Sequence, residues 1–238
     1  MKLLVVSDIH ANRPALRAIR EPVDAVVCLG DIVSYGPSPR ECLAWVRERA
    51  AHVVRGKHDM ALADGTAPGV AAFKRTLALA TLERHRHLVA EEEVAWLRML
   101  PTELSFRCED YQFYAVHASP ADHLFSYRLT PDLDAEELKK EVAEVRADIV
   151  LLGHTHLPMS RGAWTKVVLN PGSVGQPLDG DPRASYAVIE DGVAEIRRVE
   201  YDVEETAVGI RRMGLAGEVA DALIAILRTG KPCSESSS

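Results

Sequence analysis

The sequence predicts an α/β fold that begins as a parallel β-sheet with helices between its strands. Three short apolar runs rich in β-branched residues are predicted as strands, over Lys2–Ser7, Ala25–Leu29 and His52–Arg55. The segments between them, Arg13–Arg20 and Pro39–Arg49, have the residue spacing and end signals of helices. This order of elements is typical of a parallel sheet with right-handed crossovers. Such sheets bind ligands outside the carboxyl ends of their strands, so functional residues are expected there.

The rest of the chain adds a long helical region and a second series of strands. The helical region covers residues 70–99, with a break near Val89, and we expect an excursion that covers the site. Later strands are predicted over Leu104–Cys108, Tyr111–Val116, Asp148–Leu152, Val167–Leu169, Ala184–Glu190 and Val193–Val199. A helix is predicted over Ala135–Arg146. We expect one domain over residues 1–228, with a helical segment at about 203–228, and a disordered tail over 229–238.

The composition is that of an ordinary globular protein. Of the 238 residues, 47% are hydrophobic and 26% are charged, which excludes a wholly disordered or fibrous chain. The formal net charge of -7 argues against a protein that coats nucleic acid, and no dedicated nucleic-acid-binding module is seen. No apolar run reaches the roughly 18–20 residues that cross a bilayer. We therefore expect a cytoplasmic protein without a membrane partner, whose scattered cysteines are reduced structural thiols.

Histidines and aspartates cluster at the ends of the predicted strands. The clusters are Ser7-Asp8-Ile9-His10, Gly30-Asp31, Gly56-Lys57-His58-Asp59 and Gly153-His154-Thr155-His156, and His117 stands alone after a fifth strand. We expect one rim of the sheet to gather Asp8, His10, Asp31, His58, His117, His154 and His156. Mixed imidazole and carboxylate ligands suit Zn, Mn or Fe ions. A carboxylate shared between two ions is what a two-metal site requires.

A purely structural role is the alternative for each motif taken alone. A single Asp-x-His is weak evidence for a metal, and Gly-Asp is also an ordinary turn. The combination is stronger, because unrelated core histidines would not all fall at strand ends. The remaining histidines, His52, His85, His87 and His123, have no such context. His85 and His87 belong to a charged stretch, and we predict that they lie on a solvated helix face.

These motifs resemble the calcineurin-like metallophosphoesterases. The pattern of that family is DxH, GD, GNH followed by an acid, a lone His and GHxH, and this chain shows the corresponding five motifs in that order, with Lys57 in place of the Asn of the third. The flanking segments Gly30–Pro37, Val116–Pro120 and Asn170–Pro177 look closest to a small prokaryotic, phosphodiesterase-like branch. The resemblance covers Met1 to about Tyr201. It implies a four-layer α/β/β/α sandwich of two mixed sheets flanked by helices.

The resemblance also implies a dinuclear metal centre and a role for each motif residue. Asp8, His10 and His156 would hold the first ion, His117 and His154 would hold the second, and Asp31 would bridge them. Mn²⁺ is the expected metal, with Fe, Zn, Ni or Co as alternatives. A metal-bridging hydroxide would attack phosphorus in line. His58 would act as general acid or stabilise the transition state, and Asp59 would orient its ring or form a structural turn.

Lys57 departs from the family pattern, because the family has Asn at this position as a ligand of the second ion. An ammonium group has no acceptor and cannot replace that oxygen. Three outcomes are open: the ammonium occupies or repels the second site, it points to solvent, or it binds substrate phosphate. We expect a weakened second site. A smaller departure is Ala11, where relatives often have Gly; the change is conservative unless the backbone needs a positive φ.

The expected function is metal-dependent hydrolysis of a phosphate ester, with a phosphodiester favoured and a small or nucleotide-like substrate. Asn12 and Arg183 are candidate substrate contacts, since a guanidinium fork matches phosphate; an ordinary surface arginine is the alternative. Lys57 keeps a second hypothesis open, a catalytically impaired fold retained as a binding or scaffold module. A zinc peptidase would be expected to carry His-Glu-x-x-His, which this sequence lacks. The sequence leaves the oligomeric state open.

Overall fold

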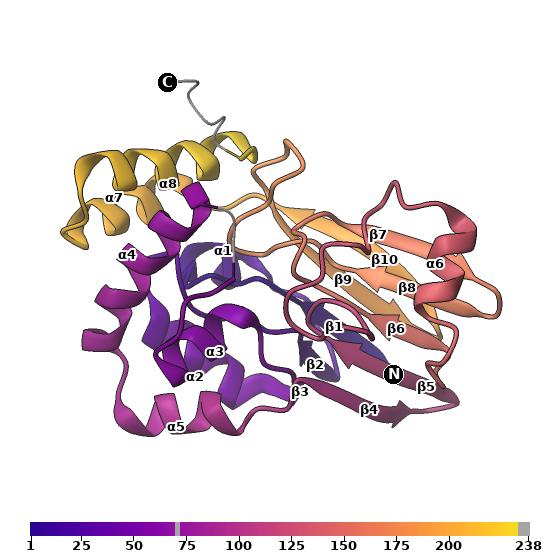
Figure 1. Ribbon diagram of the computed structural model, residues 1–238. Helices are drawn as coiled ribbons and strands as arrows, with labels where there is room; N and C mark the ends of the chain where they lie inside the picture. Colours follow the sequence, from indigo (N-terminus) through magenta and orange to yellow (C-terminus); the bar gives the residue numbers. More distant parts are fainter. Residues whose placement is uncertain (70–71, 233–238) are drawn as a thin grey trace.

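Two five-stranded mixed sheets form the centre of the computed structural model, which describes residues 1–69 and 72–232 (Figure 1). The first sheet has the order β10-β9-β1-β2-β3 and the second has the order β4-β5-β6-β8-β7. The strands are β1 (Lys2–Val6), β2 (Ala25–Cys28), β3 (Ala50–Val53), β4 (Glu103–Cys108), β5 (Tyr111–Val116), β6 (Ile149–Leu151), β7 (Met159–Ala163), β8 (Lys166–Asn170), β9 (Ala184–Glu190) and β10 (Val193–Val199).

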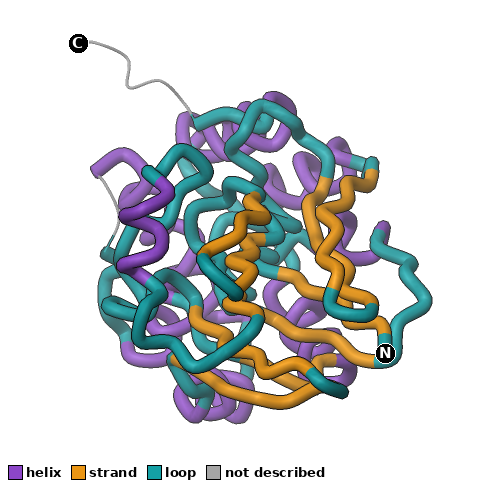
Figure 2. Tube along the Cα trace, turned by 90° about the vertical axis from the view of Figure 1, so that its right-hand side faces the viewer, coloured by secondary structure: helices purple, strands orange, loops and turns teal. Residues whose placement is uncertain are grey.

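In the described part of the chain, eight helices lie around the two sheets. They are α1 (Arg13–Ala18), α2 (Pro39–Arg49), α3 (Lys57–Asp64), α4 (Ala72–Leu88), α5 (Glu91–Met99), α6 (Ala135–Glu141), α7 (Val203–Arg212) and α8 (Gly217–Thr229). Figure 2 shows the strands in orange inside the molecule and the helices in purple around its edge. Among the described residues, no helix has the length and apolar character needed to traverse a bilayer.

Parallel pairing places the carboxyl ends of the central strands side by side. In the first sheet, β1 pairs in parallel with β2, and β2 pairs in parallel with β3, as the opening of the sequence predicts. In the second sheet, β6 pairs in parallel with β5 and β8. Antiparallel strands complete both sheets, with β9 and β10 in the first and β4 and β7 in the second. The loops that follow β1, β2, β5 and β6 therefore meet at one rim.

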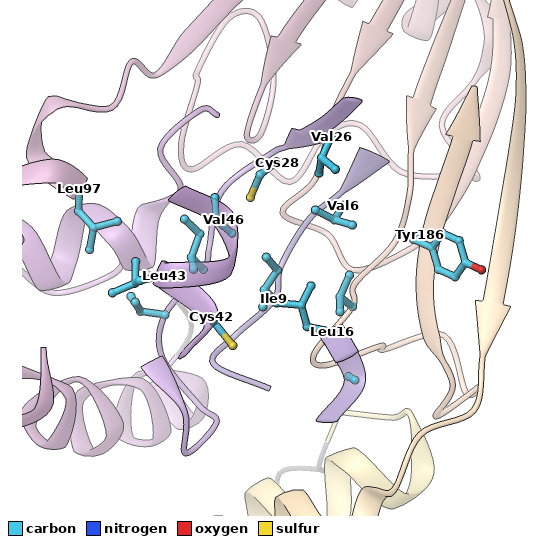
Figure 3. Close-up of a cluster of buried hydrophobic side chains, with 14 of the residues drawn as sticks. Val6, Ile9, Leu16, Val26, Cys28, Cys42, Leu43, Val46, Leu97 and Tyr186 are labelled. Atoms are coloured by element: carbon cyan, nitrogen blue, oxygen red, sulfur yellow. The ribbon is translucent and has the colours of Figure 1, made fainter. Parts of the chain in front are cut away.

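Alternation along the strands separates the core into layers. Leu4 and Val6 of β1 face the helices, where they join a cluster with residues of α1, α2 and α5 (Figure 3). Leu3 and Val5 face the other sheet and pack with residues of β5, β6 and β8. Leu138 of α6 packs on the outer face of the second sheet. The result is the expected four-layer α/β/β/α sandwich.

The prediction of elements is confirmed for most strands and corrected at several points. The helix α3 and the edge strand β7 were not expected. The C-terminal helical segment consists of two helices, because the chain turns at Gly214, where φ is +68°. Of the tail predicted over 229–238, Thr229 ends α8 and Gly230 caps it, whereas residues 233–238 lie outside the described part of the chain. Cys28, Cys42 and Cys108 are buried free thiols, as predicted.

Candidate metal centre

The candidate ligands come from both sheets and meet at the rim formed by the strand ends. Asp8 and His10 follow β1 and Asp31 follows β2, whereas His117, His154 and His156 follow strands β5 and β6 of the second sheet. The backbone N–H of His154 donates to Asp8 Oδ2 over 2.9 Å, which joins the two sheets directly. Each of the six residues is at most 5% exposed. The sequence-based grouping of these residues is therefore what the fold produces.

Asp8, His10 and His156 point their free electron pairs at one another. The Nδ1 of His10 donates to Val33 O at 3.0 Å, and the Nδ1 of His156 donates to Gln176 O at 2.6 Å. A carbonyl only accepts, so in the neutral rings the two Nε2 atoms carry lone pairs. These Nε2 atoms are 3.1 Å apart, and that of His156 is 3.2 Å from Asp8 Oδ1. Three electron donors so close together repel one another unless a cation lies between them.

A second group consists of Asp8, Asp31 and His117. The Nδ1 of His117 donates to Leu29 O at 2.7 Å, which leaves its Nε2 facing Asp31 Oδ2 at 3.2 Å. Asp31 Oδ1 accepts the backbone N–H of His58 at 2.8 Å. Each aspartate thus has one oxygen fixed by the backbone and one left for a ligand. Backbone anchoring of this kind is common behind metal ligands.

Six buried side-chain atoms have no hydrogen-bond partner in the described residues, and five of them lie at this rim. The five are Asp8 Oδ1, Asp31 Oδ2, His58 Nδ1, His117 Nε2 and His154 Nε2. Buried polar atoms normally have a hydrogen-bond partner, so such a cluster indicates a site that binds a ligand. Imidazole nitrogens and carboxylate oxygens together suit divalent ions of the Mn, Fe and Zn type. The residues at the rim therefore fit a bound divalent metal.

Burial and mutual charge set the protonation of these groups. Burial opposes ionisation of Asp8 and Asp31, but the adjacent His156 and His117 outweigh it and hold the pKa of both carboxyls below the usual range. Burial, with a contribution from His156, lowers the pKa of His10 to about 3. Burial acts in the same direction on His117, but Asp31 and Asp8 overcome it and raise the pKa of His117 to about 9. A cation that binds His117 Nε2 therefore replaces a proton.

The backbone at the rim is held in an uncommon conformation. Five of the six candidate ligands have positive φ angles between +46° and +69°: Asp8, His10, Asp31, His154 and His156. Side chains rarely adopt this left-handed region, and such strain clusters at functional sites. Ala11 also has a φ of +51°, so the backbone there does need a positive φ, and the replacement of glycine is not conformationally neutral.

Close approach explains the glycine before Lys57. A Cβ atom on Gly56 would lie 2.2 Å from both the backbone nitrogen and Oδ1 of Asp31. Only glycine leaves room for the Asp31 carboxylate at this position. The glycine of this motif therefore has a steric reason that is independent of the departure at the next residue.

Lys57 points into the rim, not to solvent. Its side chain is 2% exposed, and Nζ lies 2.9 Å from His154 Nδ1. Nζ also donates to the Tyr127 hydroxyl at 2.8 Å, and Tyr127 packs its ring 4.0 Å from the ring of His154. Burial lowers the pKa of Lys57, whereas Asp31 and Asp8 act in the opposite direction. Tyr127 contacts the site but was not predicted from the sequence, because its loop carries no motif.

His58 and Asp59 have different surroundings. His58 is buried, with Nε2 3.9 Å from Asp31 Oδ2, and burial lowers the pKa of its ring. The Asp59 carboxylate accepts backbone N–H bonds from Gly56 and from three residues of the loop after β2: Asp31, Ile32 and Val33. Asp59 makes no hydrogen bond to the His58 ring among the described residues. The contacts thus assign Asp59 to holding the loop of Asp31.

His85 corrects the sequence analysis, which placed it on a solvated helix face. It is fully buried in α4; its Nδ1 accepts the N–H of Ser34, and its Nε2 donates to Gly36 O at 2.9 Å. The segment it holds carries Tyr35, whose ring packs 4.8 Å from that of His10 and 4.9 Å from that of His58. The sequence analysis missed this role because the residues on either side of His85 are charged. His87, in contrast, is exposed, as predicted.

The two candidate substrate contacts are engaged elsewhere. The Asn12 side-chain amide donates to Gly175 O and Tyr201 Oη, and its oxygen accepts from the Ala15 N–H and the Thr206 hydroxyl. This uses both of its donors. Arg183 is half exposed and pairs with Asp181 at 2.6 Å. Contact of either residue with substrate stays a prediction.

The fold and the rim define a metallophosphoesterase-like protein, and comparison with known proteins gives the family. The model of the calcineurin-like phosphoesterase superfamily domain matches residues 1–191, so the chain belongs to this superfamily. Among curated relatives, an uncharacterised protein of Methanocaldococcus jannaschii is 29% identical over 225 residues, covering 85% of this chain and 89% of the relative. The phosphodiesterase YfcE of Escherichia coli is 26% identical over 204 residues, covering 82% of this chain and 91% of the relative.

Solved structures agree with this assignment. A metallophosphoesterase from Sphaerobacter thermophilus is 30% identical, with a TM-score of 0.77, and the match covers 97% of this chain and 99% of the other. A hypothetical protein from Pyrococcus horikoshii has a TM-score of 0.83 at 23% identity, over 98% and 99% of the two chains. The second likeness supports the fold alone.

Proposed function

We propose that this protein is a metal-dependent phosphodiesterase that hydrolyses a small phosphate ester. The observation that carries the proposal is the convergence of the Nε2 lone pairs of His10 and His156 on Asp8 Oδ1, beside the free oxygen of Asp31. A bound divalent cation would satisfy all of these donor atoms together, whereas a proton on one Nε2 would satisfy only some of them. The similarity to a phosphodiesterase of Escherichia coli supports the type of bond cleaved.

The chain's own residues have distinct tasks in this reaction. Asp8, His10 and His156 hold one divalent ion, and Asp31 and His117 face a second position. Bound divalent ions, Mn²⁺ foremost, supply the Lewis acidity that activates water and neutralises phosphate charge. Hydrogen bonds from these aspartates and histidines to the backbone fix the ligand atoms before substrate binds, so no reorganisation is needed during the reaction. His58, buried beside Asp31, is positioned to donate to the phosphate or the leaving group.

Lys57 makes the second position the weaker one. Its Nζ bonds the Nδ1 of His154, the residue that the family resemblance assigns to the second ion. A nearby ammonium also repels a divalent cation, by more in a buried site than in water. We therefore propose that the first ion binds tightly and that the second position is weak or empty. Asp8 and Asp31 remain available to a second ion, with His117 as its nitrogen ligand.

The same contact favours one alternative function. If Lys57 excludes the second ion and one ion alone does not support hydrolysis, the protein is a binding or scaffold module with the phosphoesterase fold. The burial of every candidate ligand agrees with either function. Hydrolysis itself separates the two hypotheses.

The decisive experiment measures hydrolysis of bis(p-nitrophenyl) phosphate with added Mn²⁺. We expect turnover that EDTA abolishes and that Asp31→Asn reduces by at least about a hundredfold, the usual scale for loss of an electrostatic group. Asp110→Asn, which changes a carboxylate that is 98% exposed, is the matched control and should leave turnover unchanged. Absence of turnover at every Mn²⁺ concentration would contradict the enzyme and favour the scaffold module.

Substrate class and setting complete the proposal. A nucleotide-like phosphodiester fits the phosphodiesterase relative and a domain of this size. The cytoplasmic location and the lack of a membrane partner stay predictions, and the oligomeric state stays open.

A further inference from the structure

A cavity lined by three arginines lies apart from the metal centre, between helices α1, α4 and α7. Figure 1 shows the positions of these helices. The volume of the cavity is about 510 Å³, within the range of small-molecule sites. None of the candidate metal ligands lines it. Its floor includes Pro37, which packs against Gly209 of α7. The cavity is therefore a separate feature of the surface.

The side chains of three arginines line this cavity. They belong to Arg13, Arg84 and Arg212, which form no ion pair with any carboxylate among the residues the structure describes. Arg84 donates to Gly214 O at 2.6 Å and keeps its other donors. The one acidic residue in the lining, Glu205, already pairs with Arg17 at 2.8 Å. The positive charge of the cavity is thus not neutralised by the protein.

Other arginines of the described residues, such as Arg20, Arg47 and Arg146, also form no ion pair, so what distinguishes these three is that they line one cavity. The net charge is -7, and many other arginines pair with acids, including Arg128 with Glu141 and Arg228 with Glu204. An unpaired guanidinium on a flat surface is solvated by water, but three of them in one concavity raise the local concentration of anions. Guanidinium groups match phosphate oxygens in pairs of parallel hydrogen bonds.

The rest of the lining is largely apolar, and its other polar groups are the Ser38 hydroxyl, the His87 imidazole and the Glu205 carboxylate. Leu88, Met213 and Pro14 form part of the wall. Ser38 also lines the cavity; it is the N-cap of α2, yet its side chain makes no capping hydrogen bond. An apolar wall beside phosphate-binding groups suits a ligand that has a flat, weakly polar body as well as a charged end.

We propose that this cavity is a second ligand site, which binds a mononucleotide-like phosphate monoester through Arg13, Arg84 and Arg212. The phosphate lies among the guanidinium groups, and the base packs against the apolar wall. The site acts without a metal and does not depend on the proposed hydrolysis. Its failure and the failure of the phosphodiesterase proposal are therefore distinguishable.

Calorimetric titration of the full-length chain with AMP, without added divalent cation, tests this site. We expect saturable binding, a loss of at least about tenfold in affinity for Arg13→Gln/Arg212→Gln, and much weaker binding of adenosine, which lacks the phosphate. Neither arginine side chain has a hydrogen-bond partner among the described residues, so folding should be unaffected. Circular dichroism of the variant checks this. Arg146→Gln, an exposed arginine without an ion pair before β6, is the matched control.

The comparison of ligands and variants decides the outcome. Asp31→Asn should bind AMP with unchanged affinity; a loss there would place AMP at the metal centre and overturn the proposal. Absence of binding, or equal affinity of the wild type and the double variant, would also overturn it. Inorganic phosphate is expected to bind more weakly than AMP, and equal affinity would overturn the assignment of a nucleotide-like ligand.

Discussion

Asp31 has its two carboxylate oxygens in different environments, and this division explains the chemistry of the rim. Oδ1 is held by the backbone N–H of His58, and Oδ2 faces His117 without a hydrogen bond. His10 and His156 are divided in the same way, with one ring nitrogen anchored on a carbonyl and the other free. At the residue scale, then, the backbone orients each side chain and leaves one atom for a cation.

Lys57→Asn is expected to raise the metal content of the protein. The change removes an ammonium group and its bond to His154 Nδ1 and supplies an amide oxygen in its place. Elemental analysis after dialysis against Mn²⁺ should show about one ion per chain in the wild type and about two in the variant, as expected for a two-metal site. Turnover of the phosphodiester should rise in parallel.

Lys140→Asn is the control for this experiment, because Lys140 is exposed on α6 and is not one of the residues at the rim. It should change neither metal content nor turnover. Two tightly bound ions in the wild type, with no gain for Lys57→Asn, would contradict the proposed effect of Lys57.

At the scale of elements, α4 holds the loop that follows β2. His85 bonds Ser34 and Gly36, and the Thr81 hydroxyl accepts the N–H of Tyr35 at 3.0 Å. Ser34 and Tyr35 both have positive φ angles, so this segment needs external support. The support fixes Tyr35 against the rings of His10 and His58. The helical excursion thus stabilises the rim from behind.

His85 is expected to make stability depend on pH. Burial lowers the pKa of His85 to about 4, so between about pH 6.5 and pH 4 the unfolded chain binds a proton that the folded chain does not. The contribution is complete above pH 6.5 and is lost as the pH falls through 4; it amounts to roughly 3 kcal/mol. Urea denaturation at pH 7.5, 5.5 and 4 should show this loss in the wild type.

His85→Gln retains an acceptor and a donor but cannot titrate, so its stability should fall less over the same pH range. His85→Leu should be less stable than the wild type by about 2–4 kcal/mol at pH 7.5, because it leaves the buried Ser34 N–H and Gly36 C=O unpaired. If His85→Gln and the wild type lose stability in parallel from pH 7.5 to pH 4, the assignment to His85 is wrong.

At the scale of the whole molecule, the metal centre joins the two sheets. Asp8, His10 and Asp31 belong to the first sheet, and His117, His154 and His156 belong to the second. Face-to-face packing of apolar residues such as Val5 and Leu151 brings the two strand edges together. The ligands then lie close enough to repel one another in the absence of a cation. The free energy gained by packing the core therefore offsets the cost of the strained backbone and of the charge repulsion at the rim.

Metal removal is expected to lower the melting temperature. A ligand present at a hundred times its dissociation constant stabilises the folded state by about 2.7 kcal/mol, which corresponds to roughly 5–10 °C for a chain of this size. Thermal denaturation with saturating Mn²⁺ and with EDTA measures the difference. His156→Asn should greatly reduce the shift; an unchanged shift in that variant would place the stabilising ion elsewhere.

Particular residues show how far the sequence could be interpreted. Asp8 and Asp31 could be placed at one rim because each follows a recognisable apolar strand and parallel strands of one sheet end at the same edge. His117 joins them only because the second sheet packs against the first. His85 could not be placed, because its neighbours in sequence are charged and its burial depends on a loop 49 residues away, at Gly36. Tyr127 could not be found either, because it reaches Lys57 across 70 residues.

The sequence by itself determined the family, the parallel arrangement of the opening strands and the set of side chains that meet at their ends, since local patterns and motif spacing encode these. Only the tertiary structure decided where Lys57 points, which nitrogen of each histidine is free, and that three unpaired arginines share a cavity. Those properties depend on contacts between segments far apart in the chain, whose distances and hydrogen-bond partners exist only after the sheets and helices have packed.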